Sequence, residues 1–453
     1  MKARGLGLST SRPSFSLSSV LKFILLSSLL FLLLNFSLSL YTSVSTRYYP
    51  NFRPPILRIS FSPPPPPSSS SSPASAPPLI SSVSSSYPIP SKLHLSSPSS
   101  VRRGLPKGCD LAKGEWVRDP NAPYYTNSTC RTIPEEQNCM KHGRPDFDFL
   151  KWRWKPDGCD LPAMDPAEFL ELVRGKSLAF VGDALARNQM QSLVCLLSKV
   201  EYPKEIPQKK ENRITRMFYS AHNFTLWSFW SPFLVRSEES NRSVSGSRVW
   251  HLYLDEPDPI WPAHSAHLHY LVLSTGNSWL SSPCFFHLKG ALAGCQNCAA
   301  GAAPFMPIRH AHRRAFRTAL DAFAGGFRKV AVVRTMSPSH FEEGGWNRGG
   351  DCRRTGPFRR RESPPGLEEM EMELYRDQKK EFWKAKWEGS QRGVEFRLMD
   401  VTPAMAMRAD GHPSKYGRRP EEELQVMEND CVHWCLPGPA DMWNDFLFQV
   451  LSI

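Results

Sequence analysis

The chain has 453 residues, a formal net charge of +13 at pH 7, 41 prolines and 11 cysteines. This length suits two or three average domains, or one larger α/β domain with additions. The positive charge is compatible with binding to nucleic acid, with binding to a polysaccharide, or simply with a well-solvated basic surface. The N-terminal sequence indicates a compartment without nucleic acid, which excludes the first of these partners.

The N-terminus has the pattern of a membrane signal. Residues 1–22 contain basic side chains and no acidic one, and residues 23–41, "FILLSSLLFLLLNFSLSLY", carry no charge. At 1.5 Å per residue, about 19 helical residues nearly cross a hydrocarbon core of about 30 Å. A cleaved signal peptide is the alternative, but the apolar run exceeds a usual signal core and no A-x-A-like site follows it. We therefore expect an uncleaved signal-anchor.

The charge distribution also predicts the topology. Basic residues on the N-terminal side keep residues 1–22 in the cytosol, so the rest of the chain lies in the lumen as a single-pass type II protein. A lumenal chain does not meet nucleic acid. All cysteines lie at or after Cys109, and in an oxidising lumen most pair as disulfides, with at least one left over because the count is odd.

Residues 42–107 are predicted to form a stem. This segment contains "FSPPPPPSSSSSPASAPP" and further Ser/Pro runs, which cannot bury enough apolar surface to fold. Proline-rich linkers are extended and semi-rigid, and hydroxyls beside prolines suit O-glycosylation.

A globular head begins after the stem. Residues 108–162 concentrate cysteine and tryptophan, which predicts a loop-rich N-terminal subdomain held by disulfides, and residues 163–453 form the main domain. Three N-glycosylation sequons fit a lumenal surface: Asn127-Ser128-Thr129, Asn223-Phe224-Thr225 and Asn241-Arg242-Ser243.

Short apolar runs alternate with helical segments along the main domain. This alternation predicts an α/β fold with a parallel sheet and helices on both faces. The expected elements are a strand at 177–181, a helix at 184–198, a strand at 269–276, a helix at 309–324, a strand at 329–337, and a strand followed by a helix start at 396–407.

The candidate site residues follow strands. The apolar run of "LAFVGDALARNQMQSL" (178–193) breaks at Gly182-Asp183, as a strand does when it delivers a nucleophile to the edge of a sheet, yet the next residue is Ala184. Gly276 and Asn277 end a later strand. In open α/β sheets, functional residues gather at the carboxyl ends of the strands.

A possible general base lies near the C-terminus, in "NDCVHWCLPGPADMWNDFL" (429–447). Asp430 and His433 are three residues apart, a spacing that places both on one face of a helical or tight turn. The aspartate can then orient the imidazole while its second nitrogen accepts a proton. Cys431 and Cys435 could pin this loop. The alternative is that Asp430 merely caps a helix and His433 is a surface residue.

The CxxC pair Cys295 and Cys298 is a weak metal signal. A zinc site needs a second such pair or two histidines at ligand spacing, and His310 and His312 match poorly. We therefore predict no metal and expect a disulfide or an inert turn.

The motifs together resemble the GDSL/SGNH hydrolase superfamily and, more narrowly, the plant trichome birefringence-like family. The resemblance covers about residues 109–453 and is carried by "GRPDFDFLKWRWKPDGCDLP", "FVGDALARNQMQSLVCLL", "RTMSPSHFEEGGWNRGGDCRRTGPF", "RADGHPSKYG" and "DCVHWCLPGPADMWNDFL". It implies an SGNH-like domain in a Golgi enzyme that O-acetylates a wall polysaccharide. The motifs are most similar to those of the xyloglucan-acetylating branch, and a xylan O-acetyltransferase is a further alternative.

The resemblance also implies roles at the site. The residue after Gly182-Asp183 would be the acetyl-accepting serine, His433 its base and Asp430 the orienting acid. The backbone at Asp183 and Ala184, with Gly276 and Asn277, would supply oxyanion donors. Arg187 would pair with Asp183 or meet the substrate. No cofactor is implied beyond an acetyl donor such as acetyl-CoA.

Ala184 leaves the activity open, because alanine carries no nucleophile. Three interpretations remain: a polysaccharide-binding pseudoenzyme, a slower enzyme in which His433 deprotonates a sugar hydroxyl that attacks the donor directly, or a sequence variant of an ordinary enzyme. A lumenal binding or scaffold protein that never had activity is a fourth, which the pair Asp430/His433 disfavours.

Overall fold

The structure is a computed structural model and describes residues 105–453 except 107, 208–212, 241–248, 299–300, 302, 327–328, 361, 363–366 and 418–428. The chain divides into two units, Met1–Leu95 and Ser96–Ile453, and the described residues all belong to the second. The predicted cytosolic tail, the signal-anchor and almost all of the stem lie outside the described residues. Within the described part, no helix is long and apolar enough to span a membrane.

A central sheet organises the head. The described residues give it seven strands in the order β13-β12-β9-β3-β6-β5-β4. The strands from β13 to β6 pair in parallel, whereas β5 and β4 pair antiparallel. Their bounds are β3 Ser177–Gly182, β4 Lys204–Glu205, β5 Ile214–Tyr219, β6 Phe224–Trp230, β9 Tyr270–Ser274, β12 Val330–Arg334 and β13 Glu395–Met399.

Strand β3 lies in the middle of this sheet and is apolar on both faces. Leu178 and Phe180 point into one core cluster, and Ala179 and Val181 into another. A strand that is buried on both faces has a continuous run of apolar residues, and this run made β3 predictable from the sequence.

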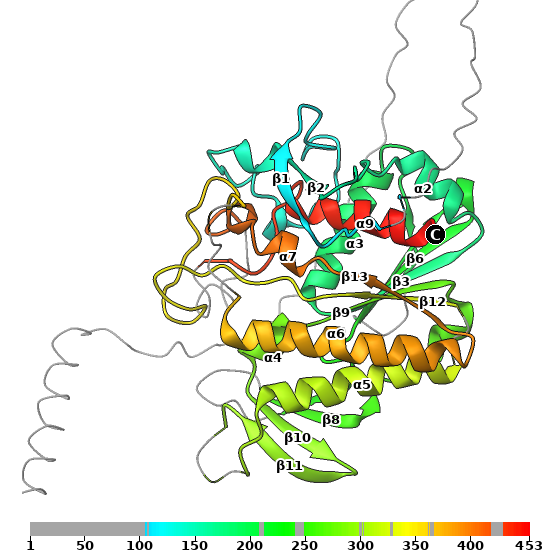
Figure 1. Cartoon of the computed structure of the whole chain (residues 1–453), viewed down its shortest axis with the longest axis vertical. Coiled ribbons are helices and arrows are strands. Elements are labelled where there is room, and N and C mark those ends of the chain that lie inside the picture. The colour runs from blue at the N-terminus through cyan, green and yellow to red at the C-terminus, as the bar shows by residue number, and fades with distance from the viewer. Residues whose placement is uncertain are drawn as a thin grey trace, which may run out of the picture. The chain divides into compact units, whose positions relative to one another are not determined.

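Helices cover both faces of the sheet, as Figure 1 shows. The helices α2 (Pro166–Leu172), α3 (Ala184–Leu197) and α9 (Met442–Leu451) contribute to the first cluster. The helices α5 (Ile308–Gly326) and α6 (Glu369–Ser390) contribute to the second. The predicted α/β fold with a mostly parallel sheet is therefore confirmed.

A smaller four-stranded sheet, in the order β11-β10-β8-β7, was not predicted. Its strands are β7 Val235–Glu239, β8 Trp250–Pro257, β10 Cys284–Leu288 and β11 Ala291–Gln296. Leu252, Leu254 and Phe286 pack against Ala311 and Ala315 of α5 in a third core cluster. Helix α5 thus lies between the two sheets.

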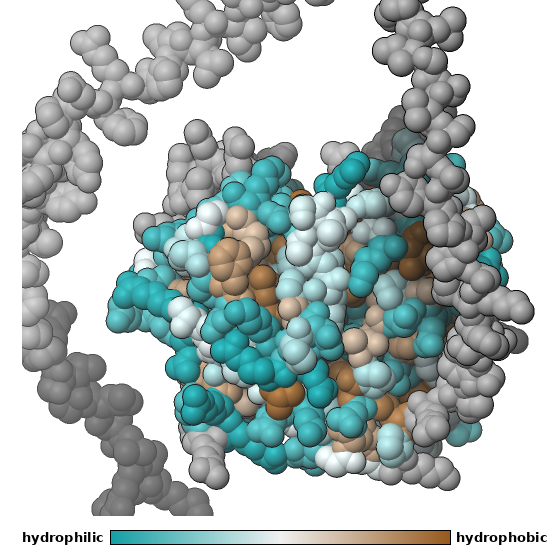
Figure 2. Space-filling model, turned by 90° about the horizontal axis from the view of Figure 1, so that it is seen from above, coloured by the Kyte–Doolittle hydropathy of each residue, from teal (hydrophilic) through white to brown (hydrophobic). Residues whose placement is uncertain are grey.

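The remaining elements are short. They are α4 Asn277–Ser281, α7 Thr402–Met405, and 3₁₀ turns at Glu135–Gln137, Asp148–Leu150, Ser220–His222, Pro262–His267, Ala409–Gly411 and Pro439–Asp441. The face of the head seen in Figure 2 is largely hydrophilic, with hydrophobic residues only in small groups.

The N-terminal subdomain is fastened to the main domain rather than only to itself. Its hairpin joins β1 (Gly114–Arg118) to β2 (Trp152–Pro156), and Cys109–Cys159 closes this part locally. However, Cys130 pairs with Cys195 of α3, and Cys139 pairs with Cys435. The predicted N-terminal subdomain held by disulfides is therefore confirmed, and two of its four cysteines have partners outside it.

The other cysteines follow the prediction. Cys352 pairs with Cys431, and Cys295 pairs with Cys298 as a disulfide. Cys284 is buried and free, which accounts for the odd count.

His312 gives the head a measurable pH dependence. It is fully buried, and this burial lowers its pKa to about 4. Below about pH 6.5 the unfolded chain therefore binds a proton here that the folded chain does not, so stability falls as the pH falls, by about 1.4 kcal/mol per pH unit down to about pH 4.

His312→Phe should remove this contribution from the slope of unfolding free energy against pH, measured by urea unfolding between pH 7 and 5. His310→Phe, at an exposed position two residues away, is the control, and an unchanged slope in His312→Phe would contradict the assignment.

Candidate functional site

The candidate site lies where β3 and β9 end side by side. Chain connections leave these two neighbouring parallel strands in opposite directions across the sheet, with β6 beyond β3 and β12 beyond β9. Such a switch point leaves a crevice outside the carboxyl ends of the strands, where α/β proteins bind their ligands. The predicted motifs at 182–184 and 276–277 flank this crevice.

The turn from β3 into α3 requires glycine at position 182. Gly182 has φ +153°, and a Cβ there would lie 1.6 Å from the carbonyl oxygen of Ser274. The close approach of β3 to the end of β9 lets Asp183 reach both segments. Its Oδ1 accepts the N–H of Leu185 at 3.1 Å, and its Oδ2 accepts the N–H of Gly276 at 3.0 Å.

Asp183 is a buried carboxylate with a buried cation below it. Burial raises the pKa of Asp183, and the positive charge of Arg334 and the two backbone N–H groups partly offset this rise. Burial also lowers the pKa of Arg334 to about 9. The guanidinium donates to Ser274 Oγ from Nε at 3.0 Å and lies 3.9 Å above the ring of Trp443. This arrangement fixes the base of the turn.

Asp430 and His433 form a hydrogen-bonded pair. His433 Nδ1 lies 2.8 Å from Asp430 Oδ2, and Oδ1 accepts the backbone N–H groups of Val432 and His433. Burial alone would raise the pKa of Asp430, but the charge of His433 and these hydrogen bonds outweigh burial and lower it. Asp430 therefore caps the turn and orients the imidazole at once, which is more than the alternative of a cap beside an unattached surface histidine allows.

Other contacts hold the loop of His433 against the sheet domain. Asn188 of α3 accepts the N–H of Trp434 at 2.8 Å and donates to the Trp434 carbonyl at 3.3 Å. The disulfides of Cys431 and Cys435 lie on either side. The ring of His412 donates from Nδ1 to the His433 carbonyl at 2.7 Å. The histidine is therefore fixed through its backbone as well as its ring.

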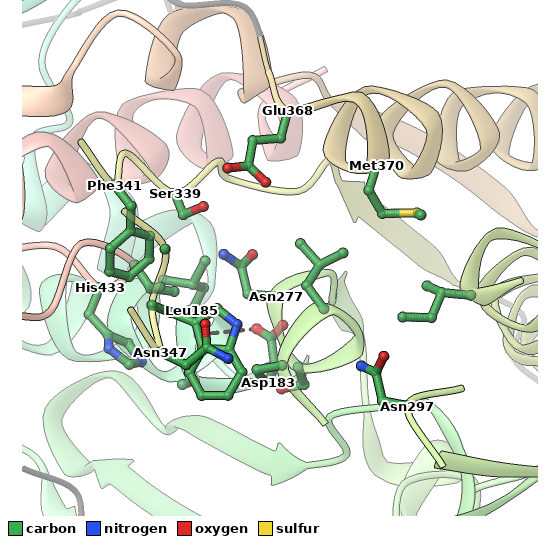
Figure 3. Close-up of a pocket in the computed structure, with 18 of the residues that line it drawn as sticks. Asp183, Leu185, Asn277, Asn297, Ser339, Phe341, Asn347, Glu368, Met370 and His433 are labelled. Atoms are coloured by element: carbon green, nitrogen blue, oxygen red, sulfur yellow. Dashed lines mark hydrogen bonds between the residues drawn. The ribbon is translucent and has the colours of Figure 1, made fainter. Parts of the chain in front are cut away.

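Ala184 and His433 line one cavity of about 460 Å³. Asp183, Leu185 and Asn277 contribute from the ends of the strands, and a loop with Phe341 and Trp346 contributes from the other side. Figure 3 shows His433 from the C-terminal loop, Asp183 from the turn, and Glu368 and Met370 from the start of α6 around this space. The structure thus brings together residues that lie about 250 positions apart in sequence.

Two predicted site residues have a different environment from the one expected. The N–H of Gly276, expected as an oxyanion donor, is already donated to Asp183. Arg187, expected to pair with Asp183 or to face the substrate, instead lies 4.2 Å above the ring of Trp230 and does not line the cavity. Asn277 does line it, and among the described residues its Oδ1 is buried without a hydrogen-bond partner.

Several serine hydroxyls lie near the site, but none takes the place of the one missing at position 184. Ser278, Ser281 and Ser339 line the cavity, and Ser339 Oγ donates to Glu371 at 2.7 Å. Ser192 donates to Asp441 at 2.5 Å and is not part of the cavity. Of the tryptophans at positions 279, 346 and 434, Trp279 and Trp434 are buried in the core, whereas Trp346 lines the cavity.

The sequence did not reveal the role of the loop at 339–348. The segment belongs to the family motif "RTMSPSHFEEGGWNRGGDCRRTGPF" and contains Gly344 and Gly345, but neither feature indicates that it lines the cavity. The buried Glu371 holds this loop by accepting both the N–H and the hydroxyl of Ser339. Within the described ranges, no group of three or more His, Cys, Asp or Glu side chains is placed to hold a metal ion.

The fold is SGNH-like, and comparison with known proteins agrees. A profile described as "GDSL/SGNH-like Acyl-Esterase family found in Pmr5 and Cas1p" matches residues 161–450. A second profile, "PMR5 N terminal Domain", matches residues 107–160.

Individual proteins with similar sequences identify the family more closely. Protein trichome birefringence-like 19 of Arabidopsis thaliana is 47% identical over 349 residues, covering 76% of this chain and 81% of the relative. Xyloglucan O-acetyltransferase 4 of Populus trichocarpa is 42% identical (76% and 81% covered), and xyloglucan O-acetyltransferase 2 of Arabidopsis thaliana is 40% identical (76% and 82% covered). The chain belongs to the trichome birefringence-like family.

The turn at Gly182 can be tested by substitution. Gly182→Ala should lower the free energy of unfolding by more than about 3 kcal/mol, since the new Cβ would overlap the Ser274 carbonyl. Gly175→Ala is the matched control: Gly175 has φ +69° but open space around its Cβ position, so the cost should be about 1–2 kcal/mol. Equal losses in urea unfolding would contradict the proposed close approach.

Asn188 can be tested in the same way. Asn188→Ala should destabilise the head by about 2–3 kcal/mol, because it leaves the buried N–H of Trp434 without its acceptor. Gln191→Ala on the same helix is the control, since Gln191 Oε1 has no hydrogen-bond partner among the described residues. A cost no larger than that of Gln191→Ala would show that Asn188 does not hold the loop.

Proposed function

We propose that this protein is an O-acetyltransferase of a plant cell-wall polysaccharide, with xyloglucan as the polymer. The observation that carries the proposal is the shared cavity in which an oriented Asp430–His433 pair lies with the start of α3. The relatives named xyloglucan O-acetyltransferase, at 40% and 42% identity, support the choice of polymer over xylan.

Ala184 removes the acetyl-serine route, so the transfer must be direct. In this mechanism His433 takes the proton of a sugar hydroxyl, and the oxygen attacks the acetyl carbonyl of a donor such as acetyl-CoA. The bond to the donor's leaving group then breaks, and that group receives the proton. No cofactor takes part besides the donor.

The negative charge that develops on the acetyl oxygen needs hydrogen-bond donors. Ala184 is the first residue of α3, where the helix dipole favours negative charge. The N–H groups of Leu185, Ala186 and Arg187 already donate to Asp183, so the backbone N–H of Ala184 is the donor that this turn offers. Asn277 provides a side-chain amide on the same cavity. One such donor commonly contributes about 3 kcal/mol to lowering the barrier.

A second candidate function is favoured by Ala184 itself. Loss of a triad nucleophile typically lowers turnover on the order of a million-fold, so the head would then serve as a polysaccharide-binding pseudoenzyme. The retained Asp430–His433 pair favours direct transfer, because a protein that only binds has no need for an oriented base.

We further propose that the head lies in the Golgi lumen, anchored by residues 23–41 as a type II membrane protein. The disulfides support an oxidising compartment. The sequon residues Asn127 and Asn223 are both exposed, as glycosylation requires, whereas Asn241 lies outside the described residues.

The proposal is tested by restoring the nucleophile. Ala184→Ser should acquire an acetyl-enzyme adduct of one acetyl mass and raise the transfer of acetyl from acetyl-CoA to xyloglucan oligosaccharide by at least about a thousand-fold. The native chain should show slow transfer without an adduct. Intact-mass spectrometry and product analysis measure both.

The matched control is Ala184→Ser combined with His433→Ala, which keeps the hydroxyl and removes the base. If native turnover also disappears in His433→Ala, direct transfer is supported. If the native chain binds the oligosaccharide but transfers nothing, the binding function holds instead. If Ala184→Ser gains neither adduct nor turnover, the acetyl-transfer site itself is refuted.

A further inference from the structure

Helix α6 separates its charges by face. Four of its acidic side chains turn toward α5 and pair with arginines there, as Arg309–Glu373 and Arg309–Asp377 at 2.9 Å, Arg313–Glu381 at 2.7 Å, and Arg317–Glu388. Figure 1 shows α6 lying along α5, and the exposed residues of α6 lie on another side of the helix. The charges on that side therefore remain to be explained.

The outer side of α6 carries cations and tryptophans. We define the α6 stripe as Arg376, Lys380, Trp383, Lys384, Lys386 and Trp387, all of which are exposed. None of its four cations forms an ion pair with the described residues. Trp383 is 54% and Trp387 is 70% exposed, which is unusual for tryptophan in a folded protein.

The spacing makes the stripe costly for the helix alone. Arg376, Lys380 and Lys384 follow one another at intervals of four residues, and like charges at this spacing destabilise a helix by about 0.2–0.5 kcal/mol per pair. Trp383 and Trp387 repeat the same interval, so both rings lie on the same side of the helix. Lys386 Nζ lies 5.3 Å from the centre of the Trp383 ring. An anionic partner would relieve the repulsion and cover the rings.

We propose that the α6 stripe is a second binding surface, for an acidic polysaccharide whose sugar rings carry carboxylates. The C–H face of a pyranose is a suitable partner for the negative face of an indole, and each lysine can pair with a carboxylate. A membrane fits less well, because interfacial helices bury a broad apolar face, whereas two tryptophans are the large apolar side chains of this stripe. The proposal does not depend on the chemistry at Ala184.

The tryptophans of the stripe lie well away from the cavity, although Arg376 is only six residues, about 9 Å, beyond Met370. Met370 lines the cavity at the start of α6, and Trp383 follows 13 residues later, about 20 Å along the helix axis at 1.5 Å per residue. A polymer bound at the stripe would therefore leave the cavity accessible to its own substrate.

The test uses the full chain, purified in detergent, and polygalacturonate as the probe, with binding measured by calorimetry. Trp383→Ala with Trp387→Ala should weaken binding at least about tenfold, and so should Lys380→Gln with Lys384→Gln. Fully methyl-esterified polygalacturonate, which keeps the ring and loses the charge, should bind at least about tenfold more weakly to the native chain. Thermal unfolding checks that each variant is folded.

Matched controls remove the same kinds of side chain elsewhere. Phe305→Ala deletes another strongly exposed aromatic ring, and Lys155→Gln with Lys289→Gln deletes two exposed cations. These should change affinity less than about twofold. If the control variants lose as much affinity as the stripe variants, or if the tryptophan variant loses none, the interaction is general charge attraction and the proposal is overturned. Tighter binding to phosphatidylserine vesicles, lost in the same variants, would overturn it in favour of a membrane surface.

Discussion

The site depends on the buried carboxylate of Asp183. This one side chain accepts hydrogen bonds from the first turn of α3 and from the end of β9, and so joins the two chain segments that flank the crevice. The geometry requires glycine at position 182, because no other residue lets β3 end against the Ser274 carbonyl. Arg334 below it supplies the compensating positive charge in a region without solvent. Without this junction the start of α3 would have no fixed position relative to Asn277.

The C-terminal loop reaches the same place by a different kind of connection. Burial in the core positions α9, but the loop before it is held by Asn188, by the disulfides Cys139–Cys435 and Cys352–Cys431, and by His412. These contacts preorganise the Asp430–His433 pair before any ligand is present. Such preorganisation is what electrostatic catalysis requires, since no reorganisation is then needed during the reaction.

The sequence predicted what depends on local patterns. The apolar run of β3, the break at Gly182-Asp183 and the D-x-x-H spacing each arise within a few residues. The structure places the β3 run in the core and Asp183, Ala184 and His433 around one cavity. It did not predict contacts decided at long range. The N–H of Gly276 is occupied because a carboxylate 93 residues earlier reaches it, and Arg187 stacks on a tryptophan that β6 provides.

Two larger elements were also missed, for different reasons. The outer strands of the small sheet, β7 and β11, are short, partly exposed and without a strong apolar run, and the longer β8 mixes apolar with charged residues. Helix α6 carries many charges and little apolar periodicity, although "EMEMELYRDQKKEFWKAKW" is rich in good helix formers. Leu374, Phe382 and Ala385 pack in the core clusters, and ion pairs with α5 add to this packing. The sequence of α6 alone reveals neither set of partners.

The central claim is that position 184 and His433 face one another across a single pocket. The most direct measurement is the alkylation rate of a thiol placed at 184, in Ala184→Cys, with and without His433→Asn. The native thiol Cys284 is buried with its pKa raised to about 12, so it contributes no background. If the claim is right, the new thiol ionises well below the usual value of about 8.5, and at pH 6.5 its alkylation slows at least about tenfold when His433 is replaced. A rate that is the same with and without the imidazole would contradict the account.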